Sequence, residues 1–557
     1  MSSRTLATAA LRLAPLVVTL STTLAPTLTA QGRPRFPPVP VPPGNPITAS
    51  KALLGKALFF EEQMSSTKRV ACATCHVLEK GGSDPRASLI RSIHPGADGK
   101  FNTADDVRGS LGVVGNQKDG KYRSTPLFRL AEQVTPRRSM SVINAVFSRA
   151  LFWDGRASET FRDPLTKTTL LRDRGALESQ AVVPVMNDGE MAHFGQSWSD
   201  IVSRLTAARP LALASRIPAA LATFVGTKGY PDLFQSAFGT KAITPARIAM
   251  AIATYERTLI SDRSPVDSFL GGSSTALTAQ ERRGEQLFRS RQVDCVGCHG
   301  GPLGTDGQFH YTGVAAQSAD LGRYLVTNNN GDRGRMKTPS VRNVALRAPY
   351  FHDGSARTLA EVVEFYDRGG NFSAPNKDRR IRRLRLSKTD KAALVAFLAA
   401  FTDPRVSAGT APFDRPLLYT ESKHVPQHYG AGTAGSQNIV PTMIAIEPPA
   451  LGNSSLTVGI DGGQGGSPAV LVLDGSPSVS GWSALGAKIH LAGTGAMILL
   501  PTITLQGTGA GKGWGSQVLR VPAIPILRNA KLYAQWLVID TGKSALAATD
   551  AVSLTIF

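Results

Sequence analysis

Cys72-Ala73-Thr74-Cys75-His76 and Cys295-Val296-Gly297-Cys298-His299 are the two stretches that decide how this chain is built. Each has the Cys-x-x-Cys-His form to which a c-type haem is attached, with both thiols bonded to the porphyrin and the adjacent His on the iron. The chain has four cysteines, and the two motifs use all of them. A zinc knuckle or a redox dithiol is the alternative, but zinc needs its ligands at one site and the motifs lie 223 residues apart. We therefore expect two covalently bound c-type haems, with His76 and His299 as iron ligands.

The start of the chain has the composition of an export signal. Arg4 and Arg12 supply positive charge before a short apolar run over 13–20, and small residues end the segment at Ala30. This pattern predicts a signal peptide over 1–30. A Pro-rich linker follows over 31–47. The apolar run is too short to span a bilayer, and the rest of the chain has no apolar stretch of 18 residues, so we expect no transmembrane segment. We expect a periplasmic or otherwise exported protein, since c-type haems are normally attached outside the cytoplasm.

The chain is strongly basic, with a formal net charge of +21. A positive surface can attract an acidic protein partner or anionic envelope material, or can serve solubility alone. No nucleic-acid-binding motif accompanies the charge, so we expect no nucleic-acid partner.

The pattern from 48 to 405 is mainly helical. Helix-start signals at Thr244-Pro245, Thr278, Thr358 and Ser387 are each followed by apolar residues at helical spacing. Two of these apolar faces extend to Leu259 and Phe401.

This region also contains an internal repeat. Gly-x-x-Leu-Phe precedes both haem motifs, at Gly55 and Gly284. After the haems, six residues recur at one offset of 199: Ser141, Val142, Asn144, Phe152, Asp154 and Gly155 match Ser340, Val341, Asn343, Phe351, Asp353 and Gly354. A fixed offset predicts two copies of one module. In this register Trp153 aligns with His352, and 24 extra residues of the first copy fall mostly within 86–123.

Beyond about 405 the composition changes to Gly, Ser, Thr, Ala and Val, with short apolar runs such as 469–473 and 532–539 separated by turn residues. This pattern predicts a linker over 406–435 and an all-β, sandwich-like domain over 436–557. The β region has no catalytic constellation, so we expect a structural or targeting appendage.

Several motifs occur in a characteristic order: Leu58-Phe59, Phe152-Trp153-Asp154-Gly155-Arg156, Glu190-Met191, Tyr255-Glu256-Arg257-Thr258-Leu259, Asp320-x-Gly322-Arg323, Val341-Arg342-Asn343-Val344 and Ala348-Pro-Tyr-Phe-His-Asp-Gly354. In these motifs and their order, the region from about 50 to 405 resembles the di-haem bacterial cytochrome c peroxidase family, including its MauG-like branch. The resemblance implies a mainly α fold with two tandem cytochrome-c-like domains, followed here by the β domain. The first, over 48–270, would be peroxidatic, and the second, over 271–405, would transfer electrons.

The resemblance also implies catalytic residues. Glu190 would move a proton between the two oxygens of peroxide, assisted by Gln180 ten residues earlier. Trp153 would lie between the haems as an electron relay. A surface carboxylate and a core indole are the alternatives for Glu190 and Trp153. The stretch from Trp153 to Gln180 is longer than in typical members, which can displace Gln180.

The sixth iron ligands separate two mechanisms. Typical family members have a Met on the second haem, whereas MauG-like members have a Tyr, and Tyr366 stands at that position here. A phenolate stabilises higher oxidation states of iron, whereas a thioether favours Fe(II). Met336 is the alternative ligand, and Tyr366 is otherwise a core aromatic. At the first haem, His94 is a candidate sixth ligand, but we expect an open iron and a loop position for His94.

Calcium is a further candidate cofactor. Asp98, Asp105 and Asp106 cluster around a Gly turn, as calcium loops do, although the EF-hand spacing is missing. The inter-domain calcium site of the family uses an Asn, and Arg138 stands at that position here.

The resemblance therefore implies an exported di-haem peroxidase that reduces hydrogen peroxide to water, with electrons relayed from the second haem to the first. The electrons would come from a small redox protein or from an oxidisable protein substrate. The alternatives are a MauG-type oxidase acting on a protein substrate, a non-catalytic di-haem electron carrier, and a surface protein whose β domain is the functional part.

Overall fold

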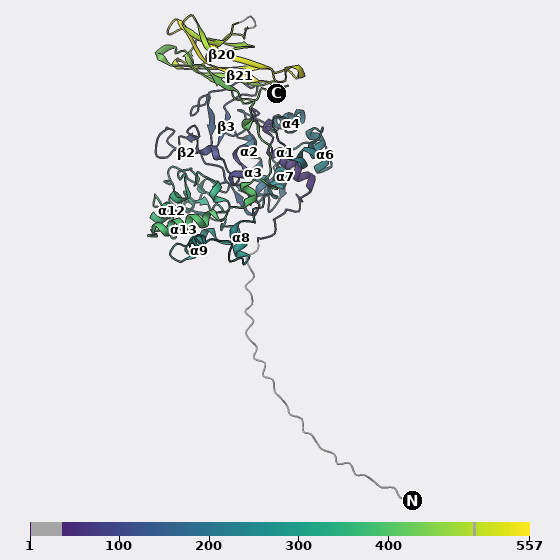
Figure 1. Ribbon diagram of the computed structural model, residues 1–557, viewed down its shortest axis with the longest axis vertical. Helices are drawn as coiled ribbons and strands as arrows, with labels where there is room; N and C mark the ends of the chain where they lie inside the picture. Colours follow the sequence, from purple (N-terminus) through teal and green to yellow (C-terminus); the bar gives the residue numbers. More distant parts are fainter. Residues whose placement is uncertain (2–35, 494–496) are drawn as a thin grey trace.

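The structure is a computed structural model that describes Met1 and residues 36–493 and 497–557. The signal peptide expected over 1–30 falls almost entirely outside the described residues. Figure 1 shows a body of helices and loops, with long strands, including β20 and β21, gathered at one end. Within the described ranges, no helix is both long and apolar enough to cross a membrane.

The body contains short and medium-length helices. They are α1 (Ala49–Phe59), α2 (Cys72–Cys75), α3 (Ala176–Ala181), α4 (Trp198–Ala207), α5 (Ala219–Val225), α6 (Tyr230–Phe238), α7 (Pro245–Glu256), α8 (Pro265–Leu270), α9 (Ala279–Arg289), α10 (Val296–His299), α11 (Tyr324–Thr327), α12 (Leu359–Arg368), α13 (Lys388–Ala399) and α14 (Pro404–Ser407). The predicted starts of α7, α9, α12 and α13 are confirmed. In each case the predicted Ser or Thr accepts a hydrogen bond from the backbone N–H three residues ahead. Leu259 and Phe401 lie beyond the ends of α7 and α13.

Small antiparallel strand pairs connect these helices. They are β1 (Ile93–His94) with β2 (Val107–Arg108), β3 (Leu111–Val114) with β4 (Glu132–Val134), β5 (Ala150–Leu151) with β6 (Ala157–Ser158), β7 (Phe161–Arg162) with β8 (Thr169–Leu171), and β9 (Phe309–His310) with β10 (Met336–Lys337). These short strands were not expected from the sequence. Strands this short are below the length at which alternating hydrophobicity can be recognised.

The same close packing of two helices occurs in both copies of the sequence repeat. Gly55 in α1 lies so close to α7 that an added Cβ would be 1.9 Å from the Ala251 carbonyl oxygen, and at Gly284 in α9 it would be 2.0 Å from that of Ala393 in α13. One helix pair therefore packs backbone to backbone before each haem motif. Figure 1 places α1 and α7 on one side of the body and α9 and α13 on the other.

The second half of the repeat is a pair of matching turns. Asn144 and Asn343 both adopt the left-handed conformation, with φ of 60° and 55°. The Asn144 Oδ1 accepts from the Ser261 backbone N–H at 2.9 Å, and the Asn343 Oδ1 accepts from that of Asp403 at 2.9 Å. The same side chain therefore closes the same loop in both copies.

The C-terminal segment forms larger sheets. Its strands are β11 (Gln427–Tyr429), β12 (Thr442–Ile444), β13 (Leu456–Gly465), β14 (Pro468–Asp474), β15 (Pro477–Ala484), β16 (Ala487–Leu491), β17 (Ile498–Leu499), β18 (Ile503–Thr504), β19 (Gly509–Leu519), β20 (Lys531–Asp540) and β21 (Ala545–Thr555). One sheet has the order β11-β21-β20-β14-β17 with β18 also on β14, a second has β12-β13-β19, and β15 pairs with β16. Buried side chains of the first two sheets, including Ile460 and Trp536, belong to one apolar cluster.

Both segments expected to be linkers contain packed residues. β11 lies within 406–435, and its backbone pairs with β21, so the sheet begins earlier than the expected start at 436. In the Pro-rich segment, the ring of Phe36 contacts that of Phe147 with centroids 5.3 Å apart. Composition identifies such segments as extended but does not show which backbone groups or rings find partners.

The extra residues of the first copy contact the C-terminal sheets. The backbone N–H of Tyr122 donates to Ser516 Oγ at 3.0 Å, and its hydroxyl donates to the Thr457 carbonyl at 3.3 Å. Shortly after this insertion, Arg129 forms an ion pair with Asp461 at 2.5 Å. The insertion therefore lies between the helical body and the β segment.

Candidate haem sites

The two motif histidines are held in the same way. His76 Nδ1 lies 3.2 Å from the Gly82 carbonyl oxygen, and His299 Nδ1 lies 3.3 Å from that of Gly304. A carbonyl only accepts, so the proton sits on Nδ1 and the Nε2 lone pair remains for a metal. Burial lowers the pKa of both rings, which keeps them neutral, as metal ligation requires.

The four thiols are free and part-buried. Burial raises the pKa of Cys75 and of Cys295 to about 12, and that of Cys298 to about 11. A zinc or redox site normally lowers a thiol pKa. The environment therefore does not favour thiolates, and the thiols suit covalent attachment to a porphyrin better than zinc.

A cavity adjoins each motif. The first encloses about 1580 Å³ and is lined by Cys75 and His76. The second encloses about 180 Å³ and is lined by Cys295, Cys298 and His299. Cofactor pockets usually enclose about 300–1000 Å³, so at the second motif the donor set, and not the volume, indicates a haem.

The predicted peroxide residues come together in the first cavity. Glu190 and Gln180 both line it, Gln180 from α3 and Glu190 from a turn that begins at Asn187. In that turn Asn187 Oδ1 accepts from the Gly189 N–H at 2.8 Å, and the Asn187 carbonyl accepts from the Glu190 N–H at 3.0 Å. Burial raises the pKa of Glu190 to about 6, although the Arg156 guanidinium acts in the opposite direction.

The inserted strand β3 supports this turn, which the sequence analysis missed. A Cβ on Gly112 would be 2.1 Å from the Gly189 carbonyl oxygen and 2.9 Å from the Glu190 Cα. In the partner strand β4, Gln133 Nε2 donates to the Asp188 carbonyl at 2.6 Å. No signal in the sequence links positions this far apart.

Trp153 lies between the two cavities and lines both of them. Its side chain is buried, and its Nε1 donates to the Arg138 carbonyl at 2.8 Å. His352, its counterpart in the repeat, also lines both cavities.

The candidate sixth ligands lie in the expected cavities. Tyr366 and Met336 both line the second cavity, Tyr366 from α12 and Met336 from β10. Burial raises the pKa of the Tyr366 hydroxyl, and the two cysteines at 295 and 298 act in the same direction. The expected loop position for His94 is wrong, because His94 belongs to β1 and is half-buried. It lines the first cavity, and its Nδ1 accepts from the Gly96 N–H at 3.1 Å.

Glu256 is another carboxyl group of the first cavity. In the sequence it was considered only as a member of the motif that begins at Tyr255. Glu256 is 2% exposed and lines this cavity, and its Oε2 has no hydrogen-bond partner among the described residues. Burial raises the pKa of Glu256 to about 8. Its motif was the available signal, but no spacing rule places it near Glu190.

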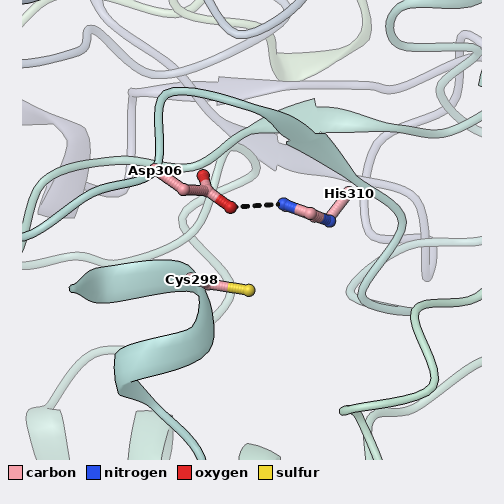
Figure 2. A group of neighbouring side chains, drawn as sticks. All are labelled: Cys298, Asp306 and His310. Carbon is pink, nitrogen blue, oxygen red and sulfur yellow. Dashed lines mark hydrogen bonds and ion pairs between the residues drawn. The ribbon is translucent and has the colours of Figure 1, made fainter.

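Three potential metal ligands lie beside the second motif (Figure 2). Single donor atoms of Cys298, Asp306 and His310 lie within 4.8 Å of one another. His310 Nε2 is 2.8 Å from Asp306 Oδ2, and its Nδ1 is 2.8 Å from Asp378 Oδ2. Cys298 belongs to the haem motif, and both ring nitrogens of His310 already face carboxylates, so this group is better explained as a hydrogen-bonded support.

The acidic loop offers little for calcium. Asp105 Oδ2 accepts from the backbone N–H groups of Ala97 and Asp98 at 2.7 and 3.1 Å, and Asp106 Oδ2 accepts from Asn102 at 2.9 Å. The carboxylates thus serve the backbone of their own loop, and calcium binding there stays a prediction.

The chain is similar to known di-haem proteins. Residues 49–275 match the family model for di-haem cytochrome c peroxidases. Methylamine utilization protein MauG of Methylorubrum extorquens is 32% identical over 363 residues, which are 65% of this chain and 80% of that protein. Cytochrome c551 peroxidase of Nitrosomonas europaea is 29% identical over 393 residues, covering 70% of this chain and 89% of that one. A solved MauG-like protein associated with microbial copper homeostasis is 26% identical, with a TM-score of 0.48, and covers 68% of this chain and 96% of that chain.

Proposed function

This chain belongs to the di-haem cytochrome c peroxidase family, and on that premise we propose that it reduces hydrogen peroxide to water with two c-type haems. Cys72, Cys75 and His76 would hold the first, and Cys295, Cys298 and His299 the second. The bound haems supply the one-electron redox chemistry. The observation that carries the proposal is the presence of Glu190 and Gln180 in the cavity of His76.

Glu190 is the proton-transfer group in this proposal. Its carboxylate takes a proton from one oxygen of hydrogen peroxide and delivers it to the other oxygen. The second oxygen then leaves as water when the O–O bond breaks. Two electrons and two further protons complete the reduction of peroxide to two water molecules. Gln180 orients the peroxide by hydrogen bonding. The partial burial that raises the pKa of Glu190 to about 6 leaves it ionised, yet basic, at neutral pH.

Trp153 is the electron relay of the proposal. Its indole borders both cavities and is fixed by the bond from Nε1 to the Arg138 carbonyl. The peroxidatic part would extend over 48–270 and the electron-transfer part over 271–405. The β segment, which begins with β11, would be an accessory domain of an exported, periplasmic protein.

A MauG-type oxidase acting on a protein substrate is the second candidate. The similarity to MauG of Methylorubrum extorquens and the position of Tyr366 in the second cavity support it. In both versions the electrons come from another protein, either a small redox protein or the oxidised substrate. The formal net charge of +21 favours an acidic one.

The test is steady-state consumption of hydrogen peroxide by the holoprotein, supplied with a reduced small c-type cytochrome. A peroxidase oxidises two cytochromes for each peroxide consumed. A di-haem electron carrier accepts electrons but consumes no peroxide above the rate of free haem, and that result would exclude the proposal.

A further inference from the structure

Two arginines at the junction of the cavities are buried without an acidic partner. Arg138 is 6% exposed and lines the first cavity, while Arg347 is 8% exposed and lines the second. Across the described part of the chain, neither forms an ion pair with a carboxylate. Other buried guanidinium groups do: Arg257 pairs with Glu178, and Arg342 with Asp267.

The hydrogen bonds of the pair go to neutral groups. Arg138 Nη2 donates to Ser83 Oγ at 2.5 Å and to the carbonyl of Arg347 at 2.6 Å. Arg347 Nη2 donates to the Ser340 carbonyl. The Nε of each arginine has no partner among the described residues. Each cation therefore has donor capacity left over.

The carboxylate that acts on Arg138 through its charge is already engaged. Asp84 raises the pKa of Arg138, but its carboxylate is bound by Arg86 at 2.9 and 3.0 Å. Burial and the neighbouring Arg347 together lower the pKa of Arg138 to about 9. An unpaired buried cation costs several kcal/mol, and two adjacent ones repel each other. An anion is needed here.

The position of the two arginines identifies that anion. Arg347 comes from the second copy, yet its side chain crosses to the loop after the first motif, where a Cβ on Gly81 would be 2.6 Å from its Cγ. It also lines the second cavity together with His299. Both arginines thus lie at the walls of the cavities that face each other, close to the residues of the haem motifs.

We infer that Arg138 and Arg347 bind the haem propionate carboxylates, Arg138 at the first haem and Arg347 at the second. This rests on the proposed function only in requiring two attached haems. A guanidinium offers a planar set of donors that matches a carboxylate and stays charged. The pair thereby forms a fixed cationic bridge between the two cofactors.

The bridge has a measurable electrostatic effect. A propionate without its cation stabilises the more positive ferric iron, so loss of one arginine lowers the reduction potential of one haem. We expect at least a tenfold change in the equilibrium constant for reduction, which equals about 59 mV for one electron. The affected haem differs between the two variants.

The experiment is a spectroelectrochemical titration of the holoprotein and of Arg138→Gln, Arg347→Gln, Arg138→Lys and Arg347→Lys. Arg149→Gln is the matched control, because it removes one positive charge at a side chain that is 85% exposed and screened by solvent. We expect the Gln variants to lower the potential of the first and the second haem respectively, with smaller changes for Lys and none for the control. Gln variants with both haems attached and unchanged potentials would overturn the inference.

A second measurement decides the case if the Gln variants do not fold. Resonance Raman bands of propionate bending in the unaltered holoprotein shift on transfer to D₂O when guanidinium N–H groups donate to the carboxylates. Insensitive bands, or potentials that change on calcium chelation, contradict the inference. Haem content by mass spectrometry is recorded separately from peroxide turnover. A protein with two haems and shifted potentials but no turnover keeps this inference and rejects the proposed function.

Discussion

The indole of Trp153 and the imidazole of His352 meet edge to face, with ring centroids 6.1 Å apart and planes inclined by 62°. The two residues occupy equivalent positions in the two copies of the repeat. Each follows a Phe in the left-handed conformation, Phe152 with φ of 66° and Phe351 with φ of 67°. The same strained turn therefore delivers one ring from each copy to the boundary between the cavities, and the difference between the copies places an oxidisable indole there.

Trp153→Phe is the variant that tests the relay. Phe keeps an aromatic ring but is much harder to oxidise, so transfer between the haems should slow at least about tenfold, equivalent to about 1.4 kcal/mol in activation free energy. Stopped-flow absorbance after mixing the reduced holoprotein with hydrogen peroxide measures the rate. Trp198→Phe, at another buried tryptophan on α4, is the control and should leave the rate unchanged. Equal rates in both variants would remove Trp153 from the electron path.

Glu190→Gln should lower peroxide turnover by about 10²–10⁴-fold, the range that general acid–base groups contribute. Gln is similar in size but accepts no proton, so both haems should stay attached. Asp188→Asn is the matched control, because Asp188 is exposed in the same turn. The measurement is kcat/KM for hydrogen peroxide at constant haem content. Similar losses of kcat/KM in the two variants would show that the conformation of the turn, and not the Glu190 carboxylate, determines turnover.

The activity of the unaltered protein should fall in acid. Glu190 acts as a base only when ionised, and its pKa is raised to about 6. Below that value kcat/KM should decrease about tenfold per pH unit, and above it the profile should be level. The pH profile of the Glu190→Gln variant should lack this limb. A limb that persists in the variant would assign the titration to another group, with Glu256 the first to test.

Local signals in the sequence account for most of what could be predicted. The haem motifs and the helix caps at Thr244, Thr278, Thr358 and Ser387 each depend on residues close to one another in the chain. The repeat is recognised by its one fixed offset. The position of Glu190 and Gln180 in one cavity came from resemblance, which carries three-dimensional information that composition lacks.

The remaining features arise from contacts between distant segments. Gly112 packs against Glu190, which is 78 positions away in the sequence. β11 pairs with β21, although β11 lies in a segment that resembled a linker. The unpaired state of Arg138 can be established only once the surroundings of its side chain are known. Sequence patterns report which residues can be buried, but not which charges are left without a partner.

Gly112→Ala should displace the turn that carries Glu190, because Gly112 packs directly against that turn. The added methyl would meet the Gly189 carbonyl oxygen at 2.1 Å, so β3 or the turn must move. We expect a loss of about 1–3 kcal/mol in the free energy of unfolding, as for other overpacked sites, and a decrease in peroxide turnover. Denaturant unfolding and kcat/KM measure the two effects. Gly475→Ala is the control, because a Cβ there has no atom within 4 Å. Normal turnover in a destabilised Gly112→Ala protein would show that β3 supports the fold without positioning Glu190.

The second haem distinguishes the two candidate functions, because Tyr366 and Met336 both line its cavity. If Tyr366 binds the iron, Tyr366→Phe should change the EPR and optical spectra of the ferric protein, and Met336→Leu should not. A phenolate ligand favours the higher oxidation states, so the unaltered ferric protein should then react with one equivalent of hydrogen peroxide without prior reduction. The opposite pattern, with spectra altered by Met336→Leu and no reaction until the second haem is reduced, would favour a peroxidase that requires reductive activation. Since both variants nearly preserve side-chain volume in one cavity, a spectral change confined to one of them identifies the ligand.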